Sequence, residues 1–162
     1  MVHLQQILTI HAPIQRVFDL SRSVEVHLAG NTHFGESAVA LGGVTTGLIG
    51  ADQQVTWQAR HFFVRQKLTS QITAFEPPTY FQDTMLSGAF QTMQHDHYFR
   101  ALTPEQTEMR DEFRFSAPLG ILGKIAEIAV LRRYMQNLLE ERNRVIQEIA
   151  ESDAWRQYLP GL

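Results

Sequence analysis

TYFQDTMLSGAFQTMQHDHYFRALTPEQTEMRDEFRFSA, residues 79–117, consists of three runs in which apolar and polar residues alternate. Short turn-forming segments, SGA at 87–89 and TPEQ at 103–106, separate these runs. Consecutive strands joined by tight turns are typical of an antiparallel meander. The segment therefore predicts three neighbouring antiparallel strands, at 79–86, 90–102 and 107–117.

The middle run contains two histidines one residue apart, in MQHDHYFR. Side chains on a strand alternate between its faces, so Met93, His95, His97 and Phe99 share one face. Because the ends of this set are apolar, it is the better candidate for the inner face. The sequence thus predicts that two imidazoles point into the protein.

The strand pattern continues towards the N-terminus. Further strands are predicted for HLQQILTI (3–10), GVTTGLIG (43–50), QVTWQARHFF (54–63) and RQKLTSQITAF (65–75). The prolines of EPP stop the last of these, since paired prolines cannot continue a hydrogen-bonded ladder. Two short helices are expected after the first strand, one following Pro13 and one in SVEVHLA, and the region from Gly30 to Gly43 is expected to be a loop.

After Pro118 the spacing of the apolar residues changes from two to three or four. This period predicts a long amphipathic helix whose apolar stripe covers the sheet. The stripe comprises Ile121, Ile125, Ile128, Leu131, Met135, Leu138, Leu139, Ile146 and Ile149. Trp155 and Leu159 are expected to dock onto the same body, and the whole chain, 1–162, is expected to form one α+β domain.

Composition limits the functional classes. Of 162 residues, 44% are hydrophobic and 19% charged, which is typical of a globular protein. The formal net charge of -3 gives no basic excess for nucleic acid, and the absence of cysteine excludes disulfides and thiolate chemistry. The N-terminus has no signal-peptide pattern and no apolar run is long enough to cross a bilayer, so a cytoplasmic protein without membrane insertion is expected. A monomer and a homodimer are both left open.

Three segments resemble the ligand-binding SRPBCC superfamily, also called START-like or Bet v 1-like, and most closely its bacterial polyketide cyclase/dehydrase-type members. They are TTGLIG…QQVTWQARHFFV, ITAFEPPTYFQDTMLSGAFQTMQHDHYF and APLGILGKIAEIAVLRRYMQNLLEERNRVI. The resemblance implies a helix-grip fold, a curved antiparallel β-sheet wrapped around a long C-terminal helix and enclosing a mostly apolar cavity. It also implies cargo such as lipids, sterols, quinones or polyketides, with cyclase or hydrolase activity in a minority, and it supplies no universal catalytic residue.

If the sheet lines such a cavity, face alternation and the helix stripe predict which residues bind the ligand. They are Trp57, His61, Phe81, Asp83, Met93, His95, His97, Phe99, Asp111, Phe113, Phe115, Leu131, Met135 and Leu138. The polar members are two carboxylates and three histidines. Which of these touch one another depends on strand register, which a single sequence does not fix.

Three interpretations of the polar members stay open. The histidines and carboxylates could brace the sheet as hydrogen-bonded pairs. They could form the polar end of a ligand cavity, in which Asp83 and Asp111 set the tautomers of His95 and His97. Or they could do chemistry, as a general base or as a metal site built on His-x-His with a third ligand from His61 or an aspartate.

Together with this resemblance, the residue pattern favours binding of a hydrophobic small molecule, for transport or sequestration, over a cyclase- or hydrolase-type enzyme. No cofactor is expected, and no metal, because a third and fourth donor cannot be placed from the sequence. No catalytic residue is assigned.

Overall fold

The computed structural model describes residues 1–30, 37–39, 43–61, 64–116 and 130–161. Its strands are β1 (Val2–Ile10), β2 (Ser37–Ala38), β3 (Gln54–His61), β4 (Val64–Glu76), β5 (Tyr80–Ser87), β6 (Thr92–Thr103) and β7 (Gln106–Ser116). Its helices are α1 (Ile14–Ser21), α2 (Val24–Gly30), α4 (Arg132–Ala150) and α5 (Trp155–Tyr158).

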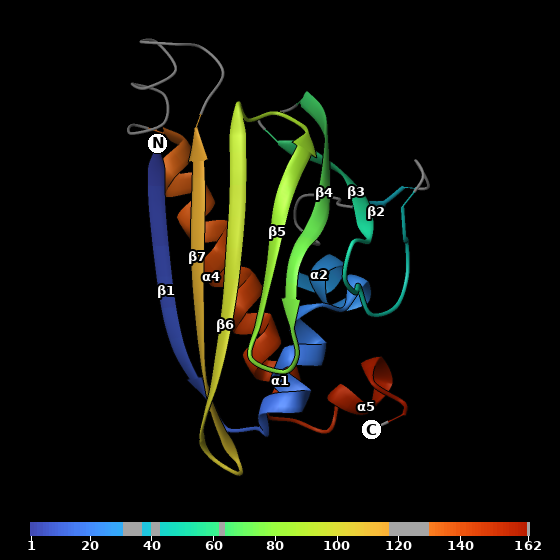
Figure 1. Ribbon diagram of the computed structural model, residues 1–162, viewed down its shortest axis with the longest axis vertical. Helices are drawn as coiled ribbons and strands as arrows, with labels where there is room; N and C mark the ends of the chain where they lie inside the picture. The colour runs from blue at the N-terminus through green and yellow to red at the C-terminus, as the bar shows by residue number, and fades with distance from the viewer. Residues whose placement is uncertain (31–36, 40–42, 62–63, 117–129, 162) are drawn as a thin grey trace.

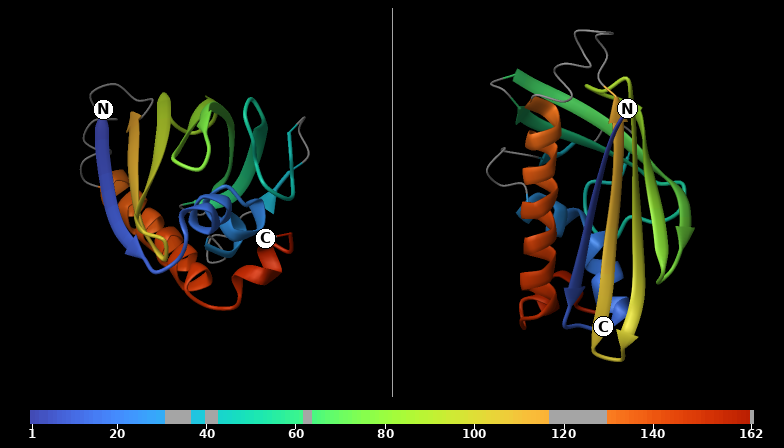
Figure 2. Two further views of the ribbon diagram at one scale, coloured as in Figure 1. Left: turned by 60° about the horizontal axis from the view of Figure 1, so that its bottom comes forward. Right: turned by 90° about the vertical axis from the view of Figure 1, so that its left-hand side faces the viewer.

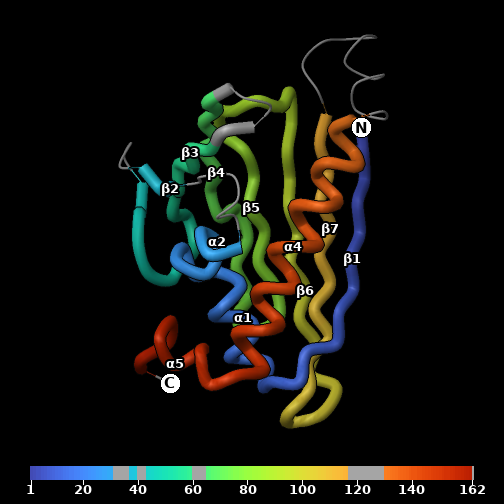
Figure 3. Tube along the Cα trace, turned by 180° about the vertical axis from the view of Figure 1, so that it is seen from behind, coloured from blue at the N-terminus to red at the C-terminus, as the bar shows by residue number. Residues whose placement is uncertain are grey.

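The strands form one seven-stranded sheet in the order β1-β7-β6-β5-β4-β3-β2, and every neighbouring pair is antiparallel (Figure 1). The sheet is strongly curved, and its helices lie on the concave side (Figure 2). Seen from behind, α4 runs across this concave side next to β1 and β7, while α1 and α2 lie beside it (Figure 3). The three-strand meander predicted for 79–117 is confirmed as β5, β6 and β7, and the predicted helix-grip fold is confirmed with it.

Helix α1 packs against the concave side of the sheet through Val17, Phe18 and Leu20, which are completely buried. Phe18 is fully buried and contacts the rings of Phe75, Phe81 and Phe99 at centroid distances of 5.4 to 5.7 Å. These contacts join α1 to three strands of the sheet. Removing so many aromatic faces from water makes this the principal hydrophobic core.

The predicted long helix is present over the residues described at its C-terminal end. Leu139, Ile146 and Ile149 of its stripe are buried, and the predicted docking of Trp155 and Leu159 is confirmed, since both join the core. The stripe positions before Leu131, which are Ile121, Ile125 and Ile128, lie outside the described residues. Within the described part of the chain, no helix is both long and apolar enough to span a membrane.

One strand prediction and one loop prediction were wrong. Segment 43–50 is an irregular connection rather than a strand, and the short strand β2 lies at 37–38, where a loop was predicted. The backbone of 43–50 forms no continuous strand ladder. Val44 N makes a single bond to Gln54 O of β3 (2.8 Å), whereas further along Val24 N donates to Gly47 O (3.0 Å) and Ile49 N donates to Arg22 O (3.0 Å). The alternating apolar residues of 43–50 therefore do not line one face of the sheet.

Candidate ligand-binding cavity

A cavity of about 320 Å³ lies between the concave face of the sheet and helices α1, α2 and α4. Most of its wall is apolar or aromatic, from β3 through to α4. The apolar residues of the wall are Ile49, Val55, Trp57, Ala59, Leu68, Ile72, Phe81, Ala89, Phe90, Met93, Phe113, Leu131, Met135, Leu138 and Leu139. Polar side chains interrupt this surface, and a mostly apolar wall with some polar groups is typical of a small-molecule site. The polar residues of the wall are Ser21, Arg22, Ser23, His27, Gln53, Gln66, Lys67, Ser70, Asp83, His95, His97, Tyr134 and Arg142.

Strand register brings the predicted polar residues together at one place. Asp83 on β5 is paired with His95 on β6, and His97 on β6 is paired with Asp111 on β7. All four side chains lie on the concave face, because the pairs are separated by two residues along β6. The register that the sequence left open therefore places two carboxylates beside two imidazoles.

His97 and Asp111 form a direct, buried pair. The His97 Nδ1 atom lies 2.7 Å from Asp111 Oδ1, and both side chains are only 2% exposed. Burial alone would raise the pKa of Asp111, but His97, by charge and hydrogen bond, holds it well below its usual range with help from His95 and Arg142. An ionised Asp111 accepts from Nδ1, so it fixes the orientation of the His97 ring, which also stacks on Phe81 at 4.1 Å.

The His95 ring has weaker polar contacts than the His97 ring. Burial, and then the nearby His97, lower the pKa of His95 well below its ordinary value, so its neutral form is favoured. Its Nδ1 atom faces the Arg142 guanidinium at 3.5 Å, a long contact, and its Nε2 atom lies 3.8 Å from Asp111 Oδ1. That second distance is too long for a hydrogen bond, and Nε2 is buried without a partner.

Asp83 completes the cluster from β5. Burial raises its pKa, although the charges of His97 and Arg142 oppose the rise, and its Oδ2 atom is buried without a hydrogen-bond partner. One ligand atom each from Asp83, His95 and His97 lies within 4.8 Å of the other two, so these are the residues that could hold a metal ion. We call Asp83, His95, His97 and Asp111 the His/Asp cluster.

Arg142 is a cavity residue that the sequence analysis missed. It is 6% exposed, and besides its contact with His95 it donates from Nη2 to the Ser21 carbonyl oxygen at the end of α1 (3.3 Å). The sequence did carry a signal for it. Arg142 lies three residues after Leu139 and four before Ile146, which is a core position of the apolar stripe.

The fourteen predicted ligand-binding residues divide into three groups by their position in the structure. Those that line the cavity are Trp57, Phe81, Asp83, Met93, His95, His97, Phe113, Leu131, Met135 and Leu138. Phe99, Asp111 and Phe115 lie on the concave face but not in the cavity wall. Phe99 packs on Phe18, Asp111 lies behind His97, and Phe115 is buried against Phe113 and Phe90. The His61 side chain lies outside what the structure describes.

Face alternation on the sheet could not have found the cavity residues contributed by helices and their connections. His27 on α2 stacks on Trp57 with ring centroids 3.8 Å apart, and Ser21 and Ser23 lie at the α1–α2 junction. These residues belong to two short helices and the connection between them, and tertiary packing sets the positions of these elements relative to the sheet. No repeating pattern in the sequence marks them as cavity residues.

Comparison by sequence finds no family model and no curated protein that matches the chain. Comparison by structure does find similar folds. A START superfamily protein from Mycobacterium smegmatis matches with a TM-score of 0.70 and 10% identity, covering 92% of this chain and 97% of that chain. The Zhui aromatase/cyclase from Streptomyces sp. R1128 matches with a TM-score of 0.64 and 13% identity over 91% and 95% of the two chains.

The structure of Ara h 8.0201 matches with a TM-score of 0.57 and 12% identity, over 91% of this chain and 98% of that chain. At such low identities these similarities speak for the fold alone. They agree with the curved seven-stranded sheet and its C-terminal helix. The chain has the helix-grip fold that START and Bet v 1-like proteins of the SRPBCC superfamily share.

Proposed function

We propose that the protein binds a hydrophobic small molecule, such as a lipid, quinone or polyketide, in the cavity and thereby carries or sequesters it. The observation that supports this most directly is the cavity of about 320 Å³ with its largely apolar wall. Its volume lies at the small end of the range for ligand sites, roughly 300–1,000 Å³. A ligand with a compact apolar body fits such a space.

The His/Asp cluster gives this cavity a polar end. Imidazole nitrogens and a half-buried carboxyl group supply hydrogen bonds in fixed directions, while the aromatic wall supplies most of the binding energy. Ligand-binding roles for Phe99, Asp111 and Phe115 would be indirect, because these residues support wall residues from behind. A ligand oxygen at the polar end is the expected orientation.

The two tryptophans allow a direct test. Trp57 lines the cavity, whereas Trp155 is buried near the C-terminus against Arg16, whose guanidinium carbon lies 4.3 Å from the ring centroid. Titration with methyl decanoate, a neutral apolar probe, should change the emission of Trp57. The change should persist in Trp155→Phe and disappear in Trp57→Phe, and native mass spectrometry should show one probe molecule per chain.

A change of equal size in both single-tryptophan proteins would indicate surface adsorption and contradict the proposal. No change in either, together with no bound mass, would also contradict it. Native mass spectrometry before and after organic extraction gives an independent check. An apolar molecule that co-purifies and is removed by extraction would support the carrier function.

A second candidate function is hydrolysis or cyclisation at the same place. The bond between His97 Nδ1 and Asp111 favours it, because an oriented imidazole is a suitable general base. We expect such an enzyme to release p-nitrophenolate from p-nitrophenyl decanoate, and to lose this activity in His97→Gln while probe binding remains. Binding without turnover in the unmodified protein would contradict the enzymatic function and support only the carrier function.

The proposal also covers domain organisation, cellular location and oligomeric state. The chain is expected to act as one ligand-binding domain, because the cavity wall draws on both ends of the chain, from Ser21 to Arg142. A cytoplasmic location is a prediction from the sequence. A monomer and a homodimer are both compatible with the proposed function, since every described wall residue comes from one chain.

A further inference from the structure

The His/Asp cluster has a spatial pattern with a chemical meaning beyond ligand orientation. His95 and His97 are two residues apart on β6, so both imidazoles project from the same face. Asp83 on the neighbouring strand is the direct partner of His95. Two imidazoles from one strand and a carboxylate from the next thus come together, with one ligand atom from each within 4.8 Å of the others.

Unsatisfied polar atoms lie at this point. Asp83 Oδ2 and His95 Nε2 are buried and have no hydrogen-bond partner, and the His95 side chain is only 5% exposed. Leaving a buried polar group unpaired costs about 1–3 kcal/mol. A metal ion bound between these atoms would satisfy both of them at once, because each can offer a lone pair.

The third ligand is already oriented. Asp111 accepts from the Nδ1 side of His97 at 2.7 Å, which leaves Nε2 as the nitrogen that can bind a metal. A carboxylate behind a metal-binding histidine fixes its tautomer and makes it a better ligand. Asp111 also adds a second negative charge to the cluster, which favours a dication.

The charge of Arg142 opposes a bound cation. The Arg142 guanidinium faces His95 Nδ1 at 3.5 Å, and it carries a permanent positive charge. When His95 binds a metal through Nε2, its Nδ1 carries the proton, so Arg142 would have to move away from this long contact. Arg142 therefore weakens metal binding, and its removal should strengthen it.

We infer that Asp83, His95 and His97 bind a divalent first-row transition-metal ion, such as Zn²⁺, at the polar end of the cavity. Imidazole with carboxylate is a ligand set suited to these ions rather than to Mg²⁺ or Ca²⁺. Three protein ligands leave a coordination position for water or for an oxygen atom of a bound molecule. The site is independent of whether the cavity carries an apolar cargo.

The test uses the whole 162-residue chain, treated with a chelator and then titrated with Co²⁺ and with Zn²⁺. Co²⁺ should produce saturable visible absorption with one ion per chain, and Zn²⁺ should displace it. Asp83→Asn and His97→Gln should each weaken binding about tenfold or more, and Asp111→Asn about 10–100-fold, as loss of a carboxylate behind a ligand does. His3→Gln is the matched control, because that histidine is 51% exposed on the opposite face.

Arg142→Met gives a change in the other direction, since loss of the nearby cation should tighten Co²⁺ binding. Circular dichroism of each variant shows whether it has folded, and the titration of the unmodified protein decides the question even where a variant has not. Absence of saturable one-to-one binding overturns the site. Binding that is unchanged in both Asp83→Asn and His97→Gln also overturns it, whereas binding of methyl decanoate reports on the carrier function separately.

Discussion

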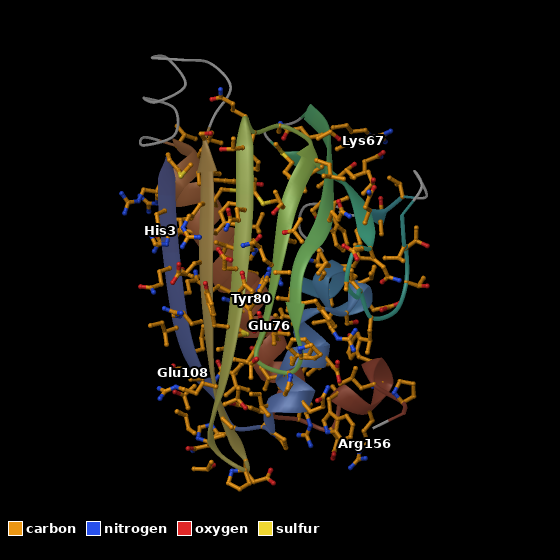
Figure 4. The ribbon with its side chains drawn as sticks, viewed as in Figure 1. His3, Lys67, Glu76, Tyr80, Glu108 and Arg156 are labelled. Atoms are coloured by element: carbon orange, nitrogen blue, oxygen red, sulfur yellow. The ribbon has the colours of Figure 1, made fainter. Side chains whose placement is uncertain are left out.

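Consecutive residues of β6 differ in how completely their buried polar groups are hydrogen-bonded. Asp96 lies between His95 and His97 but points to the outer face, where Tyr80, Gln82, Gln94 and Arg114 all donate to its carboxylate. Figure 4 views the molecule from this outer face and labels Tyr80 on it. Asp96 is fully satisfied, so it is a stabilising group, whereas the cluster on the concave face retains unpaired atoms and with them the capacity to bind.

The Asp96 network predicts a pH-dependent contribution to stability. Burial alone would raise the pKa of Asp96, but hydrogen bonds from Gln82, Tyr80 and Gln94 and the charge of Arg114 lower it overall. A lowered folded pKa means that the stabilisation is complete above the unfolded pKa, about 3.9, and is lost as the pH falls through the folded value. Asp96→Asn should therefore lower the free energy of unfolding by about 1–3 kcal/mol at pH 7.

Urea denaturation of both proteins over a range of pH measures this contribution. The difference between wild type and Asp96→Asn should shrink as the pH is lowered below about 3.9. Glu105→Gln, at an exposed turn, serves as the control and should show little difference at either pH. A difference that stays constant over this range, or grows with acid, would contradict the role given to the ionised carboxylate.

Among the predicted site residues, those on strands were accessible from the sequence, since the two-residue period alone put Asp83, His95 and His97 on one face. Their mutual contacts were not, because they depend on the register of two hairpins. Arg142 was missed for a different reason. A charged residue at a core position of a helix breaks the expected pattern, and such breaks are themselves pointers to functional sites.

At the scale of elements, the long alternating strands and the C-terminal helix were predictable, and the connection before β3 was not. Residues 43–50 have a strand-like apolar pattern, yet only Val44 bonds to β3, and Gly47 and Ile49 bond to the α1–α2 junction. Only tertiary packing decides between these partners. Glycines permit the close contacts, with Gly47 at a φ of 82° and Gly43 directly against the Gln54 carbonyl.

Gly43→Ala tests how tightly this connection is packed. A Cβ atom at position 43 would lie 2.3 Å from the Gln54 carbonyl oxygen, which is backbone of β3 and cannot turn aside. The substitution should destabilise the protein by about 1–3 kcal/mol, the usual cost of overpacking. Gly50→Ala is the matched control, because its Cβ would meet only the flexible Gln53 side chain at 3.7 Å.

Thermal unfolding of the two alanine variants measures how tightly the connection is packed against β3. Gly43→Ala should unfold at a clearly lower temperature than wild type, and Gly50→Ala close to it. Equal midpoints for the two variants would mean that the connection adjusts freely and does not hold β3 in place.

For the whole molecule, the central question is whether the helix packs directly on the sheet or leaves a space. Pattern analysis predicts that the two elements face each other but says nothing about the gap, and the cavity was expected from the family resemblance alone. The structure supplies the physical reason, which is the curvature of the sheet away from α4 (Figure 2). Small side chains on the concave face, such as Ala59 and Ser70, add to the space.

Filling this space should separate binding from folding. Ala59→Phe places a ring in the cavity from β3, where Ala59 is buried and lines the wall. Because the ring buries apolar surface in existing space, stability without ligand should be kept or raised by up to about 2 kcal/mol. Affinity for methyl decanoate should fall about tenfold or more, since a loss of 1.4 kcal/mol already has that effect.

Ala101→Phe, on the exposed end of β6 and outside the cavity wall, is the control and should bind the probe as wild type does. Fluorescence titration gives the affinity, and thermal unfolding gives the stability of the same samples. A folded Ala59→Phe protein with unchanged affinity would mean that the probe binds elsewhere. A protein that is strongly destabilised would mean that the concave face of β3 is already close-packed, because only a filled space resists an added ring.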